Sequence, residues 1–271
     1  MLEILADSAR KRVESNRLRL PLGEIQARIR DSDKERVPFV FENALKRKHG
    51  GISFICELKR ASPAKGLIDP VFPYVGIAKE YEEAGADAIS VLTEPEYFMG
   101  DDRYLTEVKR VVGIPVLRKD FIVNRYQIFE SRLLGADAVL LICALLDTPT
   151  LKSFLETCDE LGLSAIVEAH SEQEIGSALE AGARIIGVNN RNLRTLEVDI
   201  NKAICLRQFV PEHITYVAES GIQSREDVEV LERAGADAVL IGETLMKSRD
   251  RKAMLAYLKG ARAKNPEGDD E

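Results

Sequence analysis

The chain has 271 residues, of which 45% are hydrophobic and 31% are charged, as is typical of a globular protein rather than a disordered or fibrous one. Its formal net charge of −7 argues against nucleic-acid binding, because proteins that bind the phosphate backbone usually present a basic surface. The longest wholly apolar run, residues 138–146, is far shorter than the roughly 20 residues that a membrane-spanning helix needs. We therefore expect one large domain that binds neither nucleic acid nor a membrane.

The N-terminus and the cysteines bear on the cellular setting. Met1-Leu2-Glu3 is not followed by an apolar signal segment. The four cysteines are spread along the chain without a Cys-x-x-Cys pair, and the three histidines lack the spacing of metal ligands. We therefore expect reduced thiols, a cytoplasmic protein and no metal site.

The two ends of the chain differ in pattern from its middle. Residues 7–20 have the pattern of a charged amphipathic helix, and residues 21–29 that of a second helix. We interpret residues 1–48 as a helical extension, which could either plug the bottom of a barrel or cover a substrate site. Residues 263–271 are expected to be an acidic, disordered tail, because residues 265–271 carry acidic side chains and no apolar ones.

Residues 49–262 repeat one pattern and form the expected catalytic domain. In four segments a helix ends at a glycine and a short aliphatic strand follows. The glycines are Gly85, Gly135, Gly182 and Gly235. Four further strands are expected at residues 52–59, 114–119, 164–168 and 214–219. Eight strands that alternate with helices predict a closed (β/α)8 barrel, the TIM-barrel architecture.

An open, doubly wound α/β sheet is the structural alternative. Such a sheet usually has fewer strands and carries a Gly-x-Gly-x-x-Gly motif after its first strand. This motif is absent from the sequence, so we favour the barrel.

Charged and amide side chains end five of the expected strands, although barrel strands are buried on both faces and should be apolar. They are Glu57, Lys59, Lys119, Glu168, Asn189 and Glu219. These residues could form structural ion pairs, but burying each ion costs several kcal/mol. We favour an active site at the C-terminal mouth of the barrel, where lysines and glutamates shift one another's pKa values as acid–base chemistry requires.

The alternation of side chains along residues 52–59 supports this placement. Phe54 and Cys56 belong to the set that would pack on the helices, whereas Ile55, Glu57 and Lys59 belong to the set that would face the barrel axis. The first strand therefore directs both of its charged residues into the mouth.

Two glycines follow the last two expected strands, in Ser220-Gly221 and in Gly242-Glu243. In barrels, the loops after these strands commonly bind phosphate through backbone N–H groups and a helix N-terminus. Each glycine alone could be a turn residue, but the pair favours a phosphate site. The residues themselves thus indicate an enzyme that acts on a small phosphorylated substrate by acid–base chemistry without a metal.

Several motifs resemble those of indole-3-glycerol phosphate synthases and occur in the order of that family. The most specific is Ile55-Cys-Glu-Leu-Lys-Arg-Ala-Ser-Pro-Ala-Lys-Gly66, which resembles the first-strand signature. Others are Leu117-Arg-Lys-Asp-Phe121, Ile166-Val-Glu168, Gly187-Val-Asn-Asn-Arg-Asn-Leu193 and Ala218-Glu-Ser-Gly-Ile222. The resemblance spans about residues 52–246. Ala64 departs from the usual serine and Cys56 from the common alanine, and neither has a proposed catalytic role.

The resemblance implies an activity: a lyase that converts 1-(2-carboxyphenylamino)-1-deoxyribulose 5-phosphate to indole-3-glycerol phosphate, with loss of CO2 and water, in tryptophan biosynthesis. Because the sequence lacks metal-ligand spacing and a nucleotide-binding fingerprint, we expect no metal or organic cofactor. Lys119 would be the acid of ring closure and Lys59 the acid of dehydration, with Glu57 or Glu168 as the base. Asn189 and Glu219 would hold the substrate hydroxyls or a lysine ammonium.

The resemblance also implies substrate contacts. Arg191 or Ser62 would meet the anthranilate carboxylate, because arginine suits bidentate pairing. Phe121 and Leu140 would form an apolar wall for the aromatic ring. The phosphate would be bound by Ser220, Gly221, Gly242 and Glu243, the last three through backbone N–H groups.

Two other functions compete with this one. Phosphoribosylanthranilate isomerase is a related phosphate-binding barrel, but it uses a Cys/Asp or Asp/Asp pair at strand ends where this chain has Lys59 and Lys119. A noncatalytic barrel would bind a phosphorylated ligand and a partner subunit without turnover, and the complete set of lysines and glutamates argues against it. We expect a monomer, with an oligomer left open.

Overall fold

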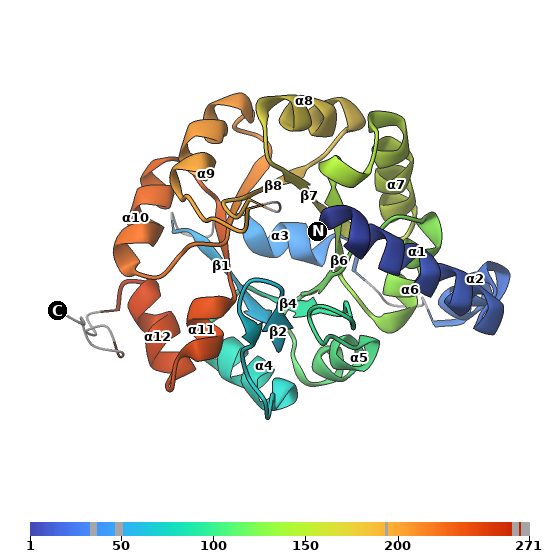
Figure 1. Ribbon diagram of the computed structural model, residues 1–271, viewed down its shortest axis with the longest axis horizontal. Helices are drawn as coiled ribbons and strands as arrows, with labels where there is room; N and C mark the ends of the chain where they lie inside the picture. Colours follow the sequence, from blue (N-terminus) through green and yellow to red (C-terminus); the bar gives the residue numbers. More distant parts are fainter. Residues whose placement is uncertain (33–36, 47–50, 193–194, 262–265, 267–271) are drawn as a thin grey trace.

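The computed structural model describes residues 1–32, 37–46, 51–192, 195–261 and 266, and these contain a closed barrel of parallel strands (Figure 1). The barrel strands are β1 (Ser53–Leu58), β4 (Ala88–Leu92), β5 (Val116–Lys119), β6 (Ala138–Ile142), β7 (Ser164–Ala169), β8 (Ile185–Asn189), β9 (Thr215–Glu219) and β10 (Ala238–Ile241). β10 pairs in parallel with β1 and closes the sheet. The predicted barrel is confirmed, and the open sheet is excluded.

Helices surround the barrel on its outside (Figure 1). They are α4 (Tyr74–Glu83), α5 (Asp102–Val111), α6 (Arg125–Leu134), α7 (Thr148–Glu160), α8 (Glu172–Ala181), α9 (Asn201–Leu206), α10 (Arg225–Arg233), α11 (Glu243–Lys247) and α12 (Arg251–Leu258), with the short 3-10 helices η1 (Cys143–Leu145) and η2 (Arg207–Phe209). The four repeat glycines adopt the left-handed backbone that ends a helix, with φ of 85°, 96°, 94° and 91° at Gly85, Gly135, Gly182 and Gly235. This conformation explains why the repeat requires glycine.

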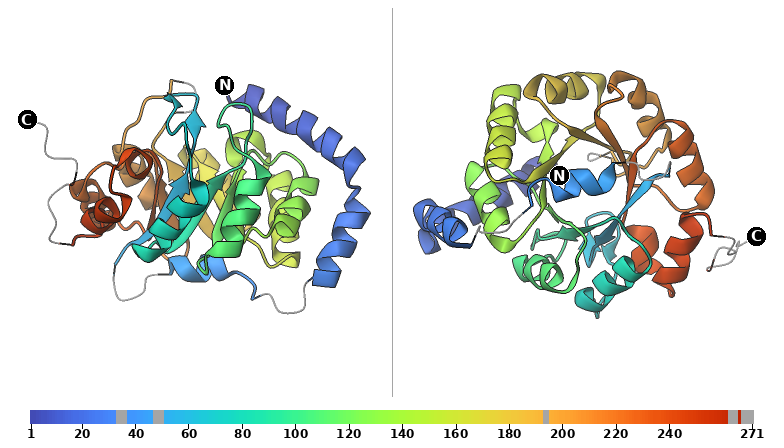
Figure 2. Two further views of the ribbon diagram at one scale, coloured as in Figure 1. Left: turned by 90° about the horizontal axis from the view of Figure 1, so that it is seen from below. Right: turned by 180° about the vertical axis from the view of Figure 1, so that it is seen from behind.

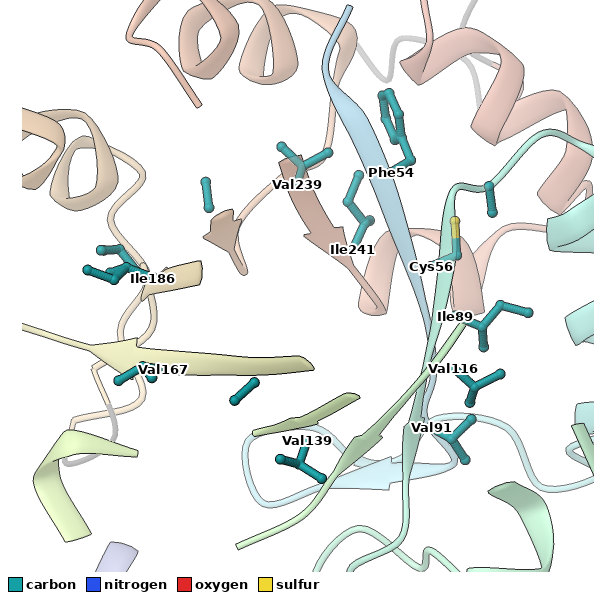
Figure 3. Close-up of a cluster of buried hydrophobic side chains, with 14 of the residues drawn as sticks. Phe54, Cys56, Ile89, Val91, Val116, Val139, Val167, Ile186, Val239 and Ile241 are labelled. Carbon is teal, nitrogen blue, oxygen red and sulfur yellow. The ribbon is translucent and has the colours of Figure 1, made fainter. Parts of the chain in front are cut away.

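Side-chain alternation along the strands divides the apolar core into two layers. The outer layer lies between the strands and the helices (Figure 3), and it includes Phe54, Cys56, Ile89, Val91, Val116, Val139, Val167, Ile186, Val239 and Ile241. The inner layer fills the barrel and includes Ile55, Leu117, Leu140, Ile166, Ile185, Val217 and Leu240. Phe54 and Cys56 thus face the helices and Ile55 faces inward, as predicted. Apolar side chains fill the barrel, and the charged side chains Glu57, Lys119, Glu168 and Glu219 stand at or next to the C-terminal ends of their strands.

The N-terminal extension forms α1 (Leu2–Arg19), α2 (Leu22–Ser32) and α3 (Val40–Leu45). The prediction placed the start of the first helix at residue 7, but α1 begins at Leu2. It begins earlier because Leu5 is buried against the inner apolar layer, with Leu2 packed beside it. The second helix continues past the predicted residue 29, to Ser32, and α3 was not predicted.

The two roles weighed for the extension belong to different helices. Leu2 and Leu5 of α1 line the cavity at the C-terminal mouth. Phe41 and Leu45 of α3 are buried in the inner layer at the opposite end, where Ser53 Oγ at the start of β1 donates to the Leu45 carbonyl at 3.4 Å. Figure 2 shows α3 at the end of the barrel opposite the N-terminus. α1 therefore covers the mouth, and α3 plugs the bottom.

A small hairpin follows β1 and was also not predicted. Its strands β2 (Ala61–Ser62) and β3 (Gly66–Leu67) pair antiparallel, and Ser62 faces the cavity from this hairpin. The expected acidic tail lies outside the described residues, apart from Pro266. None of the described helices has both the length and the apolar character needed to cross a membrane.

Candidate active site

A cavity of about 1200 Å³ opens at the C-terminal mouth of the barrel. Thirteen of the fourteen predicted site residues line it: Glu57, Lys59, Ser62, Lys119, Phe121, Leu140, Glu168, Asn189, Arg191, Ser220, Gly221, Gly242 and Glu243. Of the predicted set, Glu219 alone is not part of the lining among the described residues. The structure therefore brings together residues that are separated by up to 186 positions in the chain (243 − 57 = 186).

Lys119, at the end of β5, lies among three carboxylates. Its Nζ is 3.0 Å from Glu219 Oε2 and 3.8 Å from Glu57 Oε2. Burial disfavours the ammonium, but Glu219, Glu57 and Glu168 outweigh it and raise the pKa of Lys119 above its ordinary value. The side chain thus carries a full positive charge in the cavity wall.

Glu219 lies beneath Lys119 rather than in the cavity. Its side chain is only 1% exposed, and a Cβ built on Gly187 of the neighbouring strand β8 would lie 2.3 Å from Glu219 Oε1. Glycine at position 187 therefore makes room for this carboxylate. Burial, helped by Glu168 and Glu57, raises the pKa of Glu219 above its ordinary value despite Lys119. Of the two roles predicted for Glu219, the geometry corresponds to holding a lysine ammonium.

Glu57 and Lys59 form a second ion pair at the end of β1, with Lys59 Nζ 2.8 Å from Glu57 Oε1. Burial raises the pKa of Glu57, but Lys59 and Lys119 lower it more, so the carboxylate is ionised. A Cβ on Gly242 would lie 2.5 Å from Glu57 Oε1 and 2.9 Å from Lys59 Nζ. Glycine at 242 is thus required for the backbone after β10 to approach this pair.

Glu168, at the end of β7, is held from both sides. Asn189 Nδ2 donates to its Oε2 at 3.2 Å, and His170 Nε2 lies 3.1 Å from its Oε1. Although burial opposes ionisation, His170 and Lys119 lower the pKa of Glu168. The site therefore holds two ammonium groups and two ionised carboxylates facing one cavity.

The far side of the cavity is formed by the loops after β8, β9 and β10. Gly221 has φ of 83°, a left-handed conformation that favours glycine. Gly242 precedes the first turn of α11. Arg191 Nη2 lies 3.5 Å from Glu243 Oε2, and Arg191 Nη1 donates to the Leu196 carbonyl at 3.0 Å. Backbone N–H groups and a guanidinium thus border this end, as an anion site requires.

A family model described as "Indole-3-glycerol phosphate synthase" matches residues 2–258. The chain belongs to the indole-3-glycerol phosphate synthase family. It is 55% identical over 263 residues to the indole-3-glycerol phosphate synthase of Ruminiclostridium cellulolyticum, covering 96% of this chain and 99% of that protein. It is 50% identical over 269 residues to the one of Lachnoclostridium phytofermentans, covering 96% and 98%. The resemblance seen in the sequence motifs is confirmed, and the isomerase is set aside.

More distant solved structures share only the fold. The 3-hexulose-6-phosphate synthase of Salmonella typhimurium aligns with a TM-score of 0.63 at 18% identity, covering 78% of this chain and 98% of that one. The thiamine phosphate pyrophosphorylase of Pyrococcus furiosus aligns with a TM-score of 0.59 at 16% identity, covering 81% and 96%. Both likenesses agree with the barrel and carry no argument about activity.

Sequence reasoning missed several residues of this indole-3-glycerol phosphate synthase family site. Phe98 lines the cavity, and its ring centroid is 6.1 Å from that of Phe121, which extends the apolar wall. Lys65 reaches Glu243 Oε1 at 3.3 Å from the hairpin. His170 was also missed, although it stands two positions after Glu168, on the same face by strand alternation. No cluster of three or more potential metal ligands occurs within the described part of the chain.

Proposed function

We propose that this protein is an indole-3-glycerol phosphate synthase, a lyase of tryptophan biosynthesis. It converts 1-(2-carboxyphenylamino)-1-deoxyribulose 5-phosphate to indole-3-glycerol phosphate, CO2 and water. Family membership over residues 2–258 supports the reaction. The observation that carries the mechanism is the meeting of Lys59 and Lys119 in one cavity, each paired with a buried carboxylate.

Ring closure is the step assigned to Lys119. The aromatic carbon that bears the carboxylate attacks the ketone carbon, and the carbonyl electron pair moves onto oxygen. The Lys119 ammonium stabilises this developing charge and supplies the proton that makes the alcohol. Its raised pKa supports the electrostatic part of this assignment, because the ammonium is already charged when negative charge develops on the substrate oxygen.

Loss of CO2 follows, because the attacked ring carbon has lost its aromaticity. The electron pair of the breaking carbon–carboxylate bond returns to the ring, so this step needs no further acid. Phe98, Phe121 and Leu140 supply an apolar wall for the ring. We assign the orientation of the carboxylate before it leaves to Arg191 or Ser62, both of which line the cavity.

Dehydration needs an acid for the departing hydroxyl and a base for the proton released as the new ring becomes aromatic. We assign Lys59 as the acid. The base is Glu57 or Glu168, since both face the cavity as ionised carboxylates. Asn189, which donates to Glu168 Oε2, holds that carboxylate or a substrate hydroxyl.

The phosphate is assigned to the glycine loops. Ser220, Gly221, Gly242 and Glu243 line the cavity, with Gly242 next to Lys59, and we assign the backbone N–H groups of the last three as phosphate donors. Gly242 lies close to Lys59 Nζ, and this supports the assignment because the Lys59 ammonium would then lie beside the substrate phosphate. We further propose a cytoplasmic monomer without a cofactor, and the four free cysteines agree with a reducing compartment.

The test is to incubate the purified protein with the carboxyphenylamino ribulose phosphate and follow indole fluorescence together with CO2 release. We expect one CO2 for each indole product formed. Binding of the substrate without formation of the indole product or CO2 would instead favour a noncatalytic barrel.

A further inference from the structure

Two titratable side chains outside the predicted site, His170 and Lys202, form a hydrogen-bonded series that ends on Glu168. His170 follows β7, and Lys202 lies on α9, more than thirty positions later in the sequence. Lys202 Nζ is 3.0 Å from His170 Nδ1, and His170 Nε2 is 3.1 Å from Glu168 Oε1. Neither residue lines the cavity in the described structure. This hydrogen-bonded series therefore contacts Glu168 on the side away from the cavity.

Lys202 determines the tautomer of His170, and so whether the ring nitrogen that faces Glu168 carries a hydrogen. An ammonium has only donors, and Lys202 Nζ faces two acceptors, the Asn189 carbonyl at 2.9 Å and His170 Nδ1. His170 Nδ1 then presents its lone pair, and Nε2 carries the hydrogen. If the shared proton instead moves from Lys202 to Nδ1, Nε2 still carries its own hydrogen. Glu168 therefore receives an N–H from His170 in either state.

The second oxygen of Glu168 is held independently. Asn189 donates from Nδ2 to Glu168 Oε2, and the Asn189 Oδ1 accepts the backbone N–H of Arg191 at 3.0 Å, which fixes the amide orientation. The carboxylate thus has one donor on each oxygen, and its plane is set. Rotation about the last side-chain bond would break both hydrogen bonds.

Other charged groups surround this hydrogen-bonded series. The titratable or charged side chains that act on His170 or Glu168 include Lys119 from β5, Cys143 from η1, Glu174 from α8, Lys202 from α9 and Glu219 from β9. Burial lowers the pKa of His170, but its hydrogen bond to Glu168 raises the pKa above the ordinary value. Burial lowers the pKa of Lys202. The two shifts bring the proton affinities of Lys202 and His170 closer together, and the lowered pKa of Glu168 keeps its carboxylate ionised.

We propose that His170 is a positioning residue, kept in one orientation by Lys202, that holds the Glu168 carboxylate in the plane its step requires. This inference rests on the proposed function. His170 touches no substrate and acts through Glu168. A residue that only filled space could be replaced by any side chain of similar size. The proposed role instead requires the N–H donor of His170 Nε2 and the positive charge of Lys202.

Three variants separate donation from packing. His170→Leu fills the space without a donor, and His170→Gln keeps an N–H at a comparable reach without a titrating ring. We expect His170→Leu to lower kcat about tenfold to a hundredfold with KM changed less than about threefold, because a carboxylate displaced by about 1 Å costs on this order. His170→Gln should recover kcat to within about threefold of wild type. His213→Leu, at an exposed histidine before β9, is the matched control and should be unchanged.

The pH profile gives a readout that packing would not move. Loss of the His170 donor removes a hydrogen bond to the ionised form, so the pKa of Glu168 rises and the acid limb of kcat moves to higher pH. In Lys202→Met the cation that opposes protonation of His170 is gone, and the resulting imidazolium moves the acid limb to lower pH.

Equal losses of kcat in His170→Leu and His170→Gln, or an acid limb that moves in none of the variants, would overturn the positioning role. If circular dichroism shows that His170→Leu does not fold, the acid limbs of kcat in His170→Gln and Lys202→Met test the positioning role. A wild-type protein that forms no indole product refutes the proposed function and this inference with it. An active wild type with an unchanged His170→Leu variant refutes only the inference.

Discussion

Lys119 in the cavity wall forms an ion pair with Glu219, which lies beneath it, with 3.0 Å between Nζ and Oε2. The lysine side chain is 13% exposed, whereas the glutamate side chain is 1% exposed. Burying an isolated ion costs several kcal/mol, so Glu219 offsets the cost of keeping an ammonium in the cavity wall. Lys119 has three N–H donors, and among the described residues its hydrogen bond goes to Glu219, which leaves donors that can meet a substrate oxygen.

Lys119→Met tests the acid of ring closure. Methionine fills the space but neither donates a proton nor stabilises an alkoxide, so kcat should fall at least about a thousandfold. Steady-state kinetics with indole fluorescence measures the loss, and circular dichroism checks the fold. A variant that is well folded and keeps more than about a tenth of the wild-type kcat would remove Lys119 from the mechanism.

Glu219→Gln tests the support beneath Lys119. The amide keeps the shape and removes the charge, so the pKa of Lys119, which Glu219 helps to raise, should fall. Because the acid is active when protonated, the alkaline limb of kcat/KM should move to lower pH, and kcat should drop about tenfold or more. The exposed Glu212→Gln, before the same strand, is the control. An unmoved alkaline limb would contradict the role given to Glu219.

The barrel could be predicted because each unit repeats its own local signals. Gly135 ends a helix with a positive φ, and Phe54, Ile55 and Cys56 alternate between the two faces of a strand. Those signals lie within a few neighbouring residues. The same alternation of side chains predicted which charged residues at the strand ends face the barrel axis, and Glu57 is one of them.

The missed features depend on contacts between distant segments. α3 is six residues long, too short to show helical periodicity, and its burial depends on the barrel that it plugs. Lys202 reaches His170 because α9 packs beside β8, where Lys202 also donates to the Asn189 carbonyl. Two alternative roles were predicted for Glu219. The structure shows that its carboxylate lies against Gly187, below the cavity, where any larger side chain at position 187 would clash with it. Sequence spacing gives the face of a strand but not the depth of a side chain.

Gly242→Ala tests the close approach of the β10 loop to the Glu57–Lys59 pair. The new methyl group would lie 2.5 Å from Glu57 Oε1 and 2.9 Å from Lys59 Nζ, so both side chains must move. We expect kcat to fall about tenfold or more, with a rise in KM, since displacements of about 1 Å cost on the order of a hundredfold.

Gly176→Ala in α8 is the control for that substitution, because its Cβ would meet nothing within 4 Å. It should keep full activity and raise the free energy of unfolding by about 0.5–1 kcal/mol, as expected for alanine in place of a helical glycine. Unfolding in urea and steady-state kinetics give the two measurements. Equal activities of Gly242→Ala and Gly176→Ala would show that position 242 does not need glycine.

Arg12→Met tests the attachment of α1 to the catalytic strand. Arg12 donates to both oxygens of Asp120, at 2.6 and 3.0 Å, and Asp120 directly follows Lys119. Asp120 retains Thr93 and Arg118 as partners, so we expect the free energy of unfolding to drop by about 1–3 kcal/mol. The control is Arg10→Met on the same helix, whose partner Asp7 is exposed and whose loss should cost at most about 1 kcal/mol.

The pH dependence of that loss has a defined sign. Burial raises the pKa of Asp120, but Arg12 and Arg118 outweigh it and hold the pKa below the ordinary value of 3.8. A carboxyl with a lowered pKa stabilises the folded state above its unfolded pKa, and this contribution is lost as pH falls through the folded value. The stability difference between wild type and Arg12→Met should therefore be full near pH 7 and shrink below about pH 4. Urea unfolding at several pH values measures it, and a difference that stays constant down to about pH 2 would show that Arg12 does not act through the charge of Asp120.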